Sequence, residues 1–461
     1  MSITMEIDGD TICAISTPQG EGGIGIIRMS GNNALPILKK IFKFRGAKKV
    51  FSSHRLYLGY IVDPKKKKVI DEVFAVFMAK PKTYTREDVV EIYSHAGYAV
   101  QKNILSCVIE CGARIAEPGE FTKRAFLNGR IDLIQAESVL DIIKSETDAE
   151  LETAVNQLKG ILSQKLNRIK ENIKDALVEV ETQIDFSDED IFIEQKDVLK
   201  RLKIAKKDLD GIIASYYEGR AIKSGFNVLI LGKTNVGKSS LLNALVLEEK
   251  AIVTPIPGTT RDIIEDVIHV KGIKMKLIDT AGIRRPENII EDLGIERARQ
   301  KISEADIILW VLDGSKEYTE EDEEVYKAIR DKNIIAVINK TDLPGIMDKK
   351  LLKQKGLSTT IEVSALKNSG LEDLKEILYK LLMGKTKKRQ PVLITNFRHK
   401  DALVKTKDAV TRAMENIIKE EPLELVSFEL NDALYHLGLI TGETCPEDIL
   451  NTIFERFCIG K

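Results

Sequence analysis

The sequence is poor in cysteine, nearly free of net charge and without a long apolar run, and each scarcity excludes a class of protein. Its five cysteines are an odd number at no metal-ligand spacing, so we expect neither a disulfide framework nor a zinc site. Lys and Arg total 70 against 71 Asp and Glu, a formal net charge of -1, so any nucleic acid must bind through a local patch. No apolar run approaches the roughly 20 residues that cross a bilayer, and the start of the chain lacks the basic and apolar regions of a signal peptide. We therefore expect a cytoplasmic protein without a membrane contact.

The amino-acid composition and the length indicate a folded protein with several domains. Apolar residues make up 43% and charged residues 31% of the 461 residues. Such a balance is ordinary for globular proteins, and the length is about three times the ~150 residues of one domain. We expect more than one hydrophobic core.

The first part of the chain, residues 1–120, alternates short apolar runs with turn signals, which predicts a mixed α+β domain. One of its turns contains four consecutive lysines, at 65–68. This run could contact RNA, but a solvated hairpin tip explains it as well and is favoured.

A helical pattern follows in residues 121–221. Apolar residues such as Leu162, Leu166 and Ile169 recur at steps of three and four with charges between them, which predicts a long amphipathic helix. Such a stripe needs an apolar partner.

Residues 222–383 alternate buried-strand segments with helices, which predicts a mostly parallel sheet covered on both faces. A basic linker then opens residues 384–461, which return to a helical pattern. The simplest topology is an α/β domain inserted into a helical one, whose two parts supply each other's apolar partner. The predicted fold class is therefore multidomain, α+β and α/β.

Residues 232–239, GKTNVGKS, match the phosphate-binding pattern G-x-x-x-x-G-K-[ST] between an apolar strand and a helix. Glycines let backbone N–H groups surround phosphate oxygens, and the helix N-terminus favours negative charge. We expect Lys238 to reach the outer phosphates and Ser239 to offer its hydroxyl to Mg²⁺.

Three further motifs follow in the order that a GTPase requires: DTAG at 279–282, NKTD at 339–342 and SAL at 364–366. Asp279 would hold the magnesium shell, and Asp342 would accept the two N–H groups that guanine presents and adenine does not. Each motif alone is weak, but together with the phosphate loop they predict GTP rather than ATP.

The residue after DTAG raises a catalytic problem. Many small GTPases have a water-orienting glutamine there, whereas this chain has Ile283. Another residue must position the attacking water, and no arginine that stabilises the transition state can be assigned from the sequence.

These motifs resemble those of the TrmE-Era-EngA-type GTPases and, in particular, of the MnmE (TrmE) family of tRNA-modification GTPases. The pattern GTTRD at 258–262 has the family's spacing from the phosphate loop, and the resemblance continues in 10–31, 117–143 and the final FCIGK at 457–461. It covers nearly the whole chain. It implies an N-terminal α+β domain that binds folate, a helical domain and an inserted P-loop GTPase domain.

The resemblance implies a K⁺-dependent GTPase in which Glu291 positions the attacking water and Thr260 joins Ser239 as a Mg²⁺ ligand. Without it, Glu291 reads as a surface acid. The implied K⁺ ligands are Asn235, Thr254, Ile256 and Thr259. The implied GTP-binding residues are Gly232, Asn235, Val236, Gly237, Lys238, Ser239, Ser240, Thr254, Pro255, Ile256, Pro257, Gly258, Thr259, Thr260, Asp279, Thr280, Ala281, Gly282, Asn339, Lys340, Asp342, Ser364, Ala365 and Leu366.

The resemblance also implies a site for a tetrahydrofolate derivative at Arg28, Glu91, Arg130 and Lys461, which could otherwise be surface ion pairs. A carboxylate suits the donors of a pterin edge, and basic groups suit its carbonyl and glutamate oxygens. Arg130 stands where some members have lysine, which changes the geometry of its hydrogen bonds. Cys458 is a candidate reactive thiol, but it could equally pack as a small apolar side chain.

As the family implies, a homodimer would work with an FAD-dependent partner of the MnmG (GidA) type in a heterotetramer. Together they would add a carboxymethylaminomethyl or aminomethyl group to C5 of the wobble uridine of certain tRNAs. The carbon would come from methylene- or formyl-tetrahydrofolate, and the amine from glycine or ammonium. Two alternatives stay open: a GTP-regulated scaffold for ribosome assembly without base chemistry, and a folate-dependent carrier with a vestigial GTPase domain.

Overall fold

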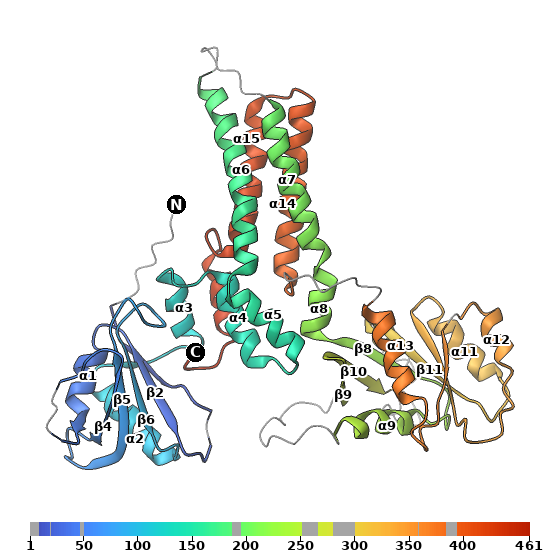
Figure 1. The fold of residues 1–461 in the computed structure, drawn as a ribbon, viewed down its shortest axis with the longest axis horizontal. Coiled ribbons are helices and arrows are strands. Elements are labelled where there is room, and N and C mark those ends of the chain that lie inside the picture. The colour runs from blue at the N-terminus through green and yellow to red at the C-terminus, as the bar shows by residue number, and fades with distance from the viewer. Residues whose placement is uncertain are drawn as a thin grey trace, which may run out of the picture. The chain divides into compact units, whose positions relative to one another are not determined.

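The computed structural model divides into two compact units (Figure 1). The first consists of Met1–Lys144, Ala154–Ile213 and Phe397–Lys461, and the second of Ser145–Thr153 and Ala214–Asn396. The structure describes residues 9–18, 20–46, 50–186, 195–250, 266–279, 300–357, 359–383 and 394–461. Among the described helices, none is both long and apolar enough to cross a membrane.

The first unit begins with a seven-stranded sheet in the order β3-β4-β5-β6-β2-β1-β7. All neighbouring pairs are antiparallel except β1 and β7. The strands are β1 (Ile12–Ile15), β2 (Gly25–Ser30), β3 (Phe42–Phe44), β4 (Arg55–Val62), β5 (Val69–Met78), β6 (Val89–Ser94) and β7 (Arg114–Ile115). Helices α1 (Ala34–Ile41) and α2 (Tyr98–Glu110) pack against the sheet and bury alternate strand residues such as Ile27, Val73 and Ile92. The period of two leaves the other residues of each strand on the opposite face.

The first unit continues with a bundle of four long helices that lie side by side (Figure 1). They are α6 (Ile161–Asp185), α7 (Gln195–Ala214), α14 (Phe397–Ile418) and α15 (Leu423–Thr441). The predicted apolar stripe is buried in α6, where Leu162, Leu166 and Ile169 are at most 1% exposed. Because α6 packs against α15, helices from before and after the second unit share one core.

The first unit also contains the short helices α3 (Glu120–Leu127), α4 (Leu133–Lys144) and α16 (Glu447–Phe454), whereas α5 (Asp148–Leu158) begins in the second unit and ends in the first. Leu133 and Ala136 of α4 share a buried cluster with Leu450, Phe454 and Phe457. The C-terminal segment is therefore anchored by its apolar side chains near the N-terminal sheet.

The second unit contains a six-stranded sheet in the order β13-β12-β11-β8-β10-β9, parallel except for β9. The strands are β8 (Phe226–Leu231), β9 (Asp266–Val270), β10 (Ile273–Asp279), β11 (Ile307–Asp313), β12 (Ile334–Asn339) and β13 (Thr360–Glu362). The helices are α8 (Tyr216–Ser224), α9 (Lys238–Lys250), α11 (Glu320–Ile329), α12 (Lys349–Gln354) and α13 (Leu371–Met383). Two separate buried clusters cover the sheet, one with residues of α9 and α13 and the other with residues of α11 and α12. All seven residues of β11 are buried, as predicted for a strand covered on both faces.

The two ends of the second unit's main segment lie together. The backbone N–H of Ile394 donates a hydrogen bond to Ser215 Oγ at 3.4 Å, and both groups are buried. The chain therefore enters and leaves this unit at neighbouring points.

Candidate functional site

The parallel strands of the second unit bring the predicted motifs to one edge of the sheet. The loop 232–237 follows β8, β10 ends at Asp279, β12 ends at Asn339, and Ser364 follows β13 closely. Because these strands are parallel, their carboxyl ends share an edge, which is where α/β sheets bind ligands.

The phosphate loop packs closely against two strands. A Cβ at Gly232 would lie 2.3 Å from the carbonyl oxygen of Val311 in β11, and one at Gly237 would lie 2.3 Å from Asn339 Nδ2. Gly237 also has a φ of 95°, a conformation that glycine adopts without the cost of a side chain. The two glycines are therefore required by the close approach of the neighbouring strands.

The loop ends where α9 begins at Lys238, with Ser239 and Ser240 exposed in its first turn. Lys238 Nζ donates a hydrogen bond to the carbonyl of Lys233 at 2.7 Å, within the loop itself. Lys233 in turn forms an ion pair with the buried Asp322 of α11 at 2.7 Å. These contacts hold the loop at the start of α9.

Asn339 connects three of the motifs. Its amide group is buried at 2% exposure, where Nδ2 donates to the carbonyl of Val236 at 2.9 Å and Oδ1 accepts from the N–H of Ala365 at 3.1 Å. One side chain therefore fixes the backbone of the phosphate loop relative to the SAL loop.

Lys340 adds a second connection across the site. Its Nζ donates to the carbonyl of Asn235 at 2.8 Å and pairs with Asp313 Oδ2 at 2.7 Å. Asn235 has a φ of 62°, in the left-handed region, so the lysine fixes an unusual backbone position. Burial would raise the pKa of Asp313, but hydrogen bonds from Lys340 and Ser315 bring it below its usual value.

Asp342 is held as a carboxylate. Its Oδ1 accepts a hydrogen bond from Ser364 Oγ at 2.6 Å, which lowers the pKa of Asp342. Ser364 is buried, whereas Leu366 is 84% exposed. An ionised Asp342 next to the Ser364–Leu366 loop has free lone pairs with which to accept hydrogen bonds from a base.

The sequence analysis missed two contributors to this arrangement, Asp313 and Asp322. Asp313 ends the fully buried strand β11, and its pairing with Lys340 spans 27 positions. The position of Asp313 at the end of a long apolar run could have indicated from the sequence that it belongs to the site. The contact between Lys233 and Asp322 spans 89 positions and has no such signal.

Several predicted residues lie outside the described part of the chain, and Asp279 is described only through its backbone. They are Thr254, Pro255, Ile256, Pro257, Gly258, Thr259, Thr260, Thr280, Ala281, Gly282 and Glu291.

A second candidate site lies on the N-terminal sheet, where Arg28 of β2 stands opposite Glu91 of β6. Arg28 Nε pairs with Glu91 Oε1 at 2.8 Å, and Glu91 Oε2 accepts from the hydroxyl of Tyr93 at 2.6 Å. Burial and the nearby carboxylate raise the pKa of Tyr93 to about 12, so it remains a donor. Tyr93 was missed, although its position two residues after Glu91 on one strand face could have indicated it.

The C-terminal segment reaches the same place. Arg28 Nη1 donates to the carbonyl of Gly460 at 3.3 Å, and Ile459 bridges Pro118. Lys461 therefore follows directly on a residue bonded to Arg28, and Cys458 is an exposed free thiol close by in sequence.

Arg130 joins this site through aromatic rings. Its guanidinium lies 4.6 Å from the centre of the Tyr84 ring, and Arg28 lies 5.7 Å from that of Phe121. Tyr84 packs against the cluster that contains Phe121. Burial raises the pKa of Tyr84, whose hydroxyl bonds to Thr122 Oγ1. Arg28 and Arg130 thus each face one of two rings that the sequence analysis missed, while Glu91 and the carbonyl of Gly460 reach this place through their bonds to Arg28.

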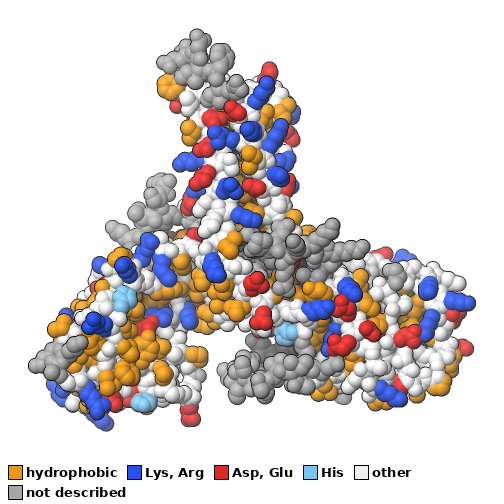
Figure 2. All heavy atoms as spheres, in the orientation of Figure 1, with side chains coloured by type: hydrophobic (Ala, Val, Ile, Leu, Met, Phe, Trp, Pro, Cys, Tyr) orange, Lys and Arg blue, Asp and Glu red, His pale blue; other side chains and the backbone are white. Residues whose placement is uncertain are grey.

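The face of the sheet that carries Arg28 and Glu91 is apolar beyond them. Leu58 pairs with Phe74, and Phe74 with Tyr93, so their side chains form a row across β4, β5 and β6. Leu56, Leu58 and Phe74 are 56%, 36% and 45% exposed. Figure 2 shows hydrophobic side chains gathered over this sheet. An exposed apolar patch of this kind is typical of a surface that a partner covers.

A phosphate loop on a mostly parallel sheet, followed in sequence by DTAG and then by the hydrogen-bonded NKTD and SAL motifs, defines the chain as a P-loop GTPase. Two family models match it: the MnmE helical domain over residues 133–458 and the GTP-binding protein TrmE N-terminus over residues 11–130. The chain belongs to the MnmE family of tRNA modification GTPases.

Individual relatives agree along the whole length. The tRNA modification GTPase MnmE of Thermoanaerobacter sp. (strain X514) is 50% identical, over 98% of this chain and 99% of the relative. That of Geobacter sulfurreducens is 45% identical over the same shares. Among solved structures, Era of Aquifex aeolicus bound to GDP.AlF4- is 30% identical, over 40% of this chain and 66% of that chain, with a TM-score of 0.28. The family assignment rests on the full-length relatives, and the predicted fold class is confirmed.

Proposed function

We propose that this chain binds and hydrolyses GTP in the course of tRNA modification, with tRNA as the substrate of the whole process. Membership of the MnmE family supports both the hydrolysis and the tRNA. The observation that carries guanine specificity is the side-chain arrangement around Asn339 and Asp342. Asn339 fixes the loops on both sides of the base position, and the ionised Asp342 supplies an acceptor for the N–H groups of guanine.

Replacing this acceptor tests the assignment. Asp342→Asn converts a carboxylate into an amide that also donates, so we expect an about 100-fold loss of GTP affinity, from two charge-assisted hydrogen bonds. The same variant should gain affinity for xanthosine triphosphate, which carries a carbonyl where guanine has an amino group. Titration with fluorescent nucleotide analogues measures both.

Asp348→Asn is the matched control, because Asp348 caps α12 with its carboxylate and asparagine caps a helix equally well. Unchanged GTP affinity of Asp342→Asn would remove Asp342 from base recognition.

The nucleotide-binding residues predicted from the sequence remain our proposal for the complete site. We assign Ser239 and Thr260 to Mg²⁺ and the catalytic water to Glu291. Asn235, Thr254, Ile256 and Thr259 are assigned to K⁺. The fixed backbone of Asn235 supports its part in this set, since a cation ligand on a preorganised loop binds with less loss of entropy. Potassium, when bound there, would supply the positive charge that an arginine supplies in other GTPases.

We assign a tetrahydrofolate derivative to the site of Arg28, Glu91, Arg130 and Lys461. The carboxylate of Glu91 suits pterin donors, Arg130 suits a carboxylate, and the neighbouring rings suit a flat heterocycle. The exposed apolar row of β4, β5 and β6 supports a homodimer that covers this face of the sheet.

The proposed domains are residues 1–120 for folate binding and dimerisation, 222–383 for GTP, and 121–221 with 384–461 for the helical part. With an FAD-dependent partner of the MnmG type in a heterotetramer, the protein would add an aminomethyl or carboxymethylaminomethyl group to C5 of a wobble uridine. The exposed Cys458 thiol is a candidate participant, and we assign it no step.

Nucleoside mass spectrometry of tRNA from a deletion strain tests the modification directly. We expect the wobble uridines of some tRNAs to lack their C5 substituent, and a plasmid copy of the gene should restore it. Unchanged wobble uridines would favour the ribosome-assembly scaffold. Omitting GTP, folate, K⁺ or the flavoprotein in turn from a reconstituted reaction identifies which of them the chemistry requires.

A further inference from the structure

Helix α7 carries four lysines on its outer face. Each residue of an α-helix advances by about 100°, so side chains at positions 196, 200, 203 and 207 fall within an arc of about 60°. The opposite side of α7 is buried in the bundle through Val198, Leu202, Ala205 and Leu209. All four lysines are exposed, and we call Lys196, Lys200, Lys203 and Lys207 the lysine stripe.

Among the residues that the structure describes, no acid forms an ion pair with the lysine stripe. Within the described ranges, no hydrogen bond or ion pair involves any of its four side chains. Three acids of the bundle pair with other cations: Asp175 and Glu179 with Arg201, and Asp210 with Lys407. Asp197 and Asp208 of α7 stand next to the stripe in sequence, and no ion pair joins them to it. The stripe therefore presents four positive charges to solvent.

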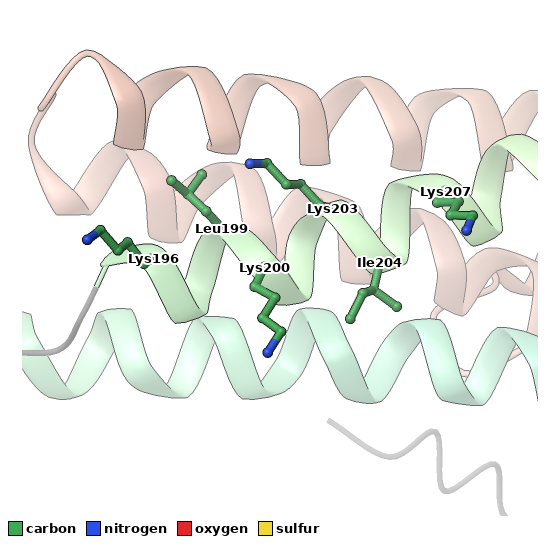
Figure 3. A pocket seen from close by; sticks show the side chains of 6 residues that line it. All are labelled: Lys196, Leu199, Lys200, Lys203, Ile204 and Lys207. Carbon is green, nitrogen blue, oxygen red and sulfur yellow. The ribbon is translucent and has the colours of Figure 1, made fainter.

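The lysines surround a shallow depression of about 470 Å³ that Leu199 and Ile204 also line. Figure 3 shows the side chains fanning out from α7, with Lys200 turned toward one neighbouring helix and Lys203 toward another. Ile204 is 44% exposed, and none of the described side chains that line the depression is aromatic or an arginine. Protein interfaces are usually centred on such anchors, so this surface is poorly suited to a protein partner.

We propose that the lysine stripe binds the sugar–phosphate backbone of tRNA, an inference that rests on the proposed function of the chain in tRNA modification. Successive lysines are three or four residues apart, which is about 4.5–6 Å along the helix axis, and the row extends over about 16 Å. Such a row matches a chain of regularly repeated negative charges. Lysine is a flexible point charge, which suits contacts that position a nucleic acid without reading its bases.

The run Lys65–Lys68 shows what a lysine cluster without this role looks like. It forms the hairpin tip between β4 and β5, where the N–H groups of Lys65 and Lys66 donate to Asp63 Oδ1. Lys65 also pairs with Glu110 at 2.9 Å, and Lys66 with Asp63 at 3.8 Å. Two lysines of this run are therefore paired, one with Glu110 of α2 and one with Asp63 of the hairpin itself, whereas no described acid pairs with the lysine stripe.

Salt-dependent binding of purified tRNA to the full chain tests the proposal. Each phosphate contact contributes about 0.7–0.9 to the slope of log affinity against log salt, so Lys200→Gln, Lys203→Gln and Lys207→Gln combined should reduce that slope by roughly two to three. We expect an about tenfold loss of affinity near 0.15 M salt, with GTP hydrolysis unchanged. Replacing the same lysines by arginine should retain binding. The matched control, Lys66→Gln, Lys67→Gln and Lys68→Gln, removes as much charge from the hairpin tip and should bind like the parent.

Other outcomes overturn the proposal. If the parent binds tRNA and the glutamine variant, folded by circular dichroism, has the same affinity and slope, the stripe does not contact RNA. If that variant instead loses only the binding of a polyglutamate probe, the surface serves an acidic protein. If the parent shows no salt-dependent affinity for tRNA, the stripe proposal also fails, and the wobble-uridine analysis of the deletion strain then decides the proposed function independently.

Discussion

The nucleotide site and the site on the N-terminal sheet are built in opposite ways. In the nucleotide site, Asn339 and Lys340 bond to backbone carbonyls, so the side chains mainly fix the course of the main chain. In the N-terminal site, Arg28, Glu91 and Tyr93 bond to one another through their side chains. The first arrangement depends on loop geometry, and the second depends on charge. Substitutions should therefore affect the two sites in different ways.

The largest effect is expected from Asn339→Ala. The change leaves the carbonyl of Val236 and the N–H of Ala365 without partners in a buried place, at about 1–3 kcal/mol each. We expect an about 100-fold loss of GTP affinity in titrations with a fluorescent analogue, and no change in folate binding.

Asn333→Ala is its control, since Asn333 is exposed and its amide makes one long contact of 3.5 Å. If Asn339→Ala bound GTP like the parent, the nucleotide site would not depend on side chains that hold its loops in place, and the contrast with the N-terminal site would fail.

An intermediate effect is expected from Glu91→Gln, which preserves the size of the side chain and removes its charge. The loss of one charge-assisted hydrogen bond, about 1.5–3 kcal/mol, should weaken binding of a tetrahydrofolate derivative by about tenfold or more in calorimetry. GTP turnover should stay at the parental rate.

Glu72→Gln serves as the reference, because Glu72 is a strand carboxylate that pairs with Arg45 on the surface. A parallel fall in GTP affinity in Glu91→Gln would contradict the independence of the two sites.

The smallest effect is expected from Tyr93→Phe, which removes only the hydroxyl that donates to Glu91. Because this hydroxyl acts on the ligand only by orienting Glu91, we expect a loss of folate affinity of several-fold, less than for the loss of the carboxylate charge. Calorimetry with Tyr98→Phe, whose ring is 76% exposed, provides the comparison. An effect as large as that of Glu91→Gln would mean that Tyr93 itself touches the ligand.

The same contrast explains which features the sequence could predict. Each of the motifs at 232–239, 339–342 and 364–366 is an unbroken run of residues that follows a strand. Parallel strands bring their carboxyl ends to one edge of the sheet, so the proximity of the motifs followed from the strand pattern. The apolar stripe of α6 was equally readable because burial in a helix repeats every three to four residues.

Contacts between distant segments could not be read in this way. Nothing local relates Tyr84 to Arg130, or Lys233 to Asp322, because each pair forms only after strands and helices have packed. The apolar face of β4 and β5 was also missed. Alternation shows that a strand has two faces, but not that the second face of this sheet would stay uncovered within one chain.

The hydrogen bond between Ser215 and Ile394 has a consequence for folding of the nascent chain during synthesis. At roughly 5–20 residues per second, a ribosome needs on the order of ten to forty seconds to make the segment between α7 and α14. During that interval α6 and α7 have emerged, while the partners of their apolar surfaces do not yet exist. The GTPase unit is complete only when this interval ends, because it extends to Asn396, and the contact between Ser215 and Ile394 then brings the start of α14 close to the end of α7. Chaperones would accordingly be most needed by the first half of the bundle.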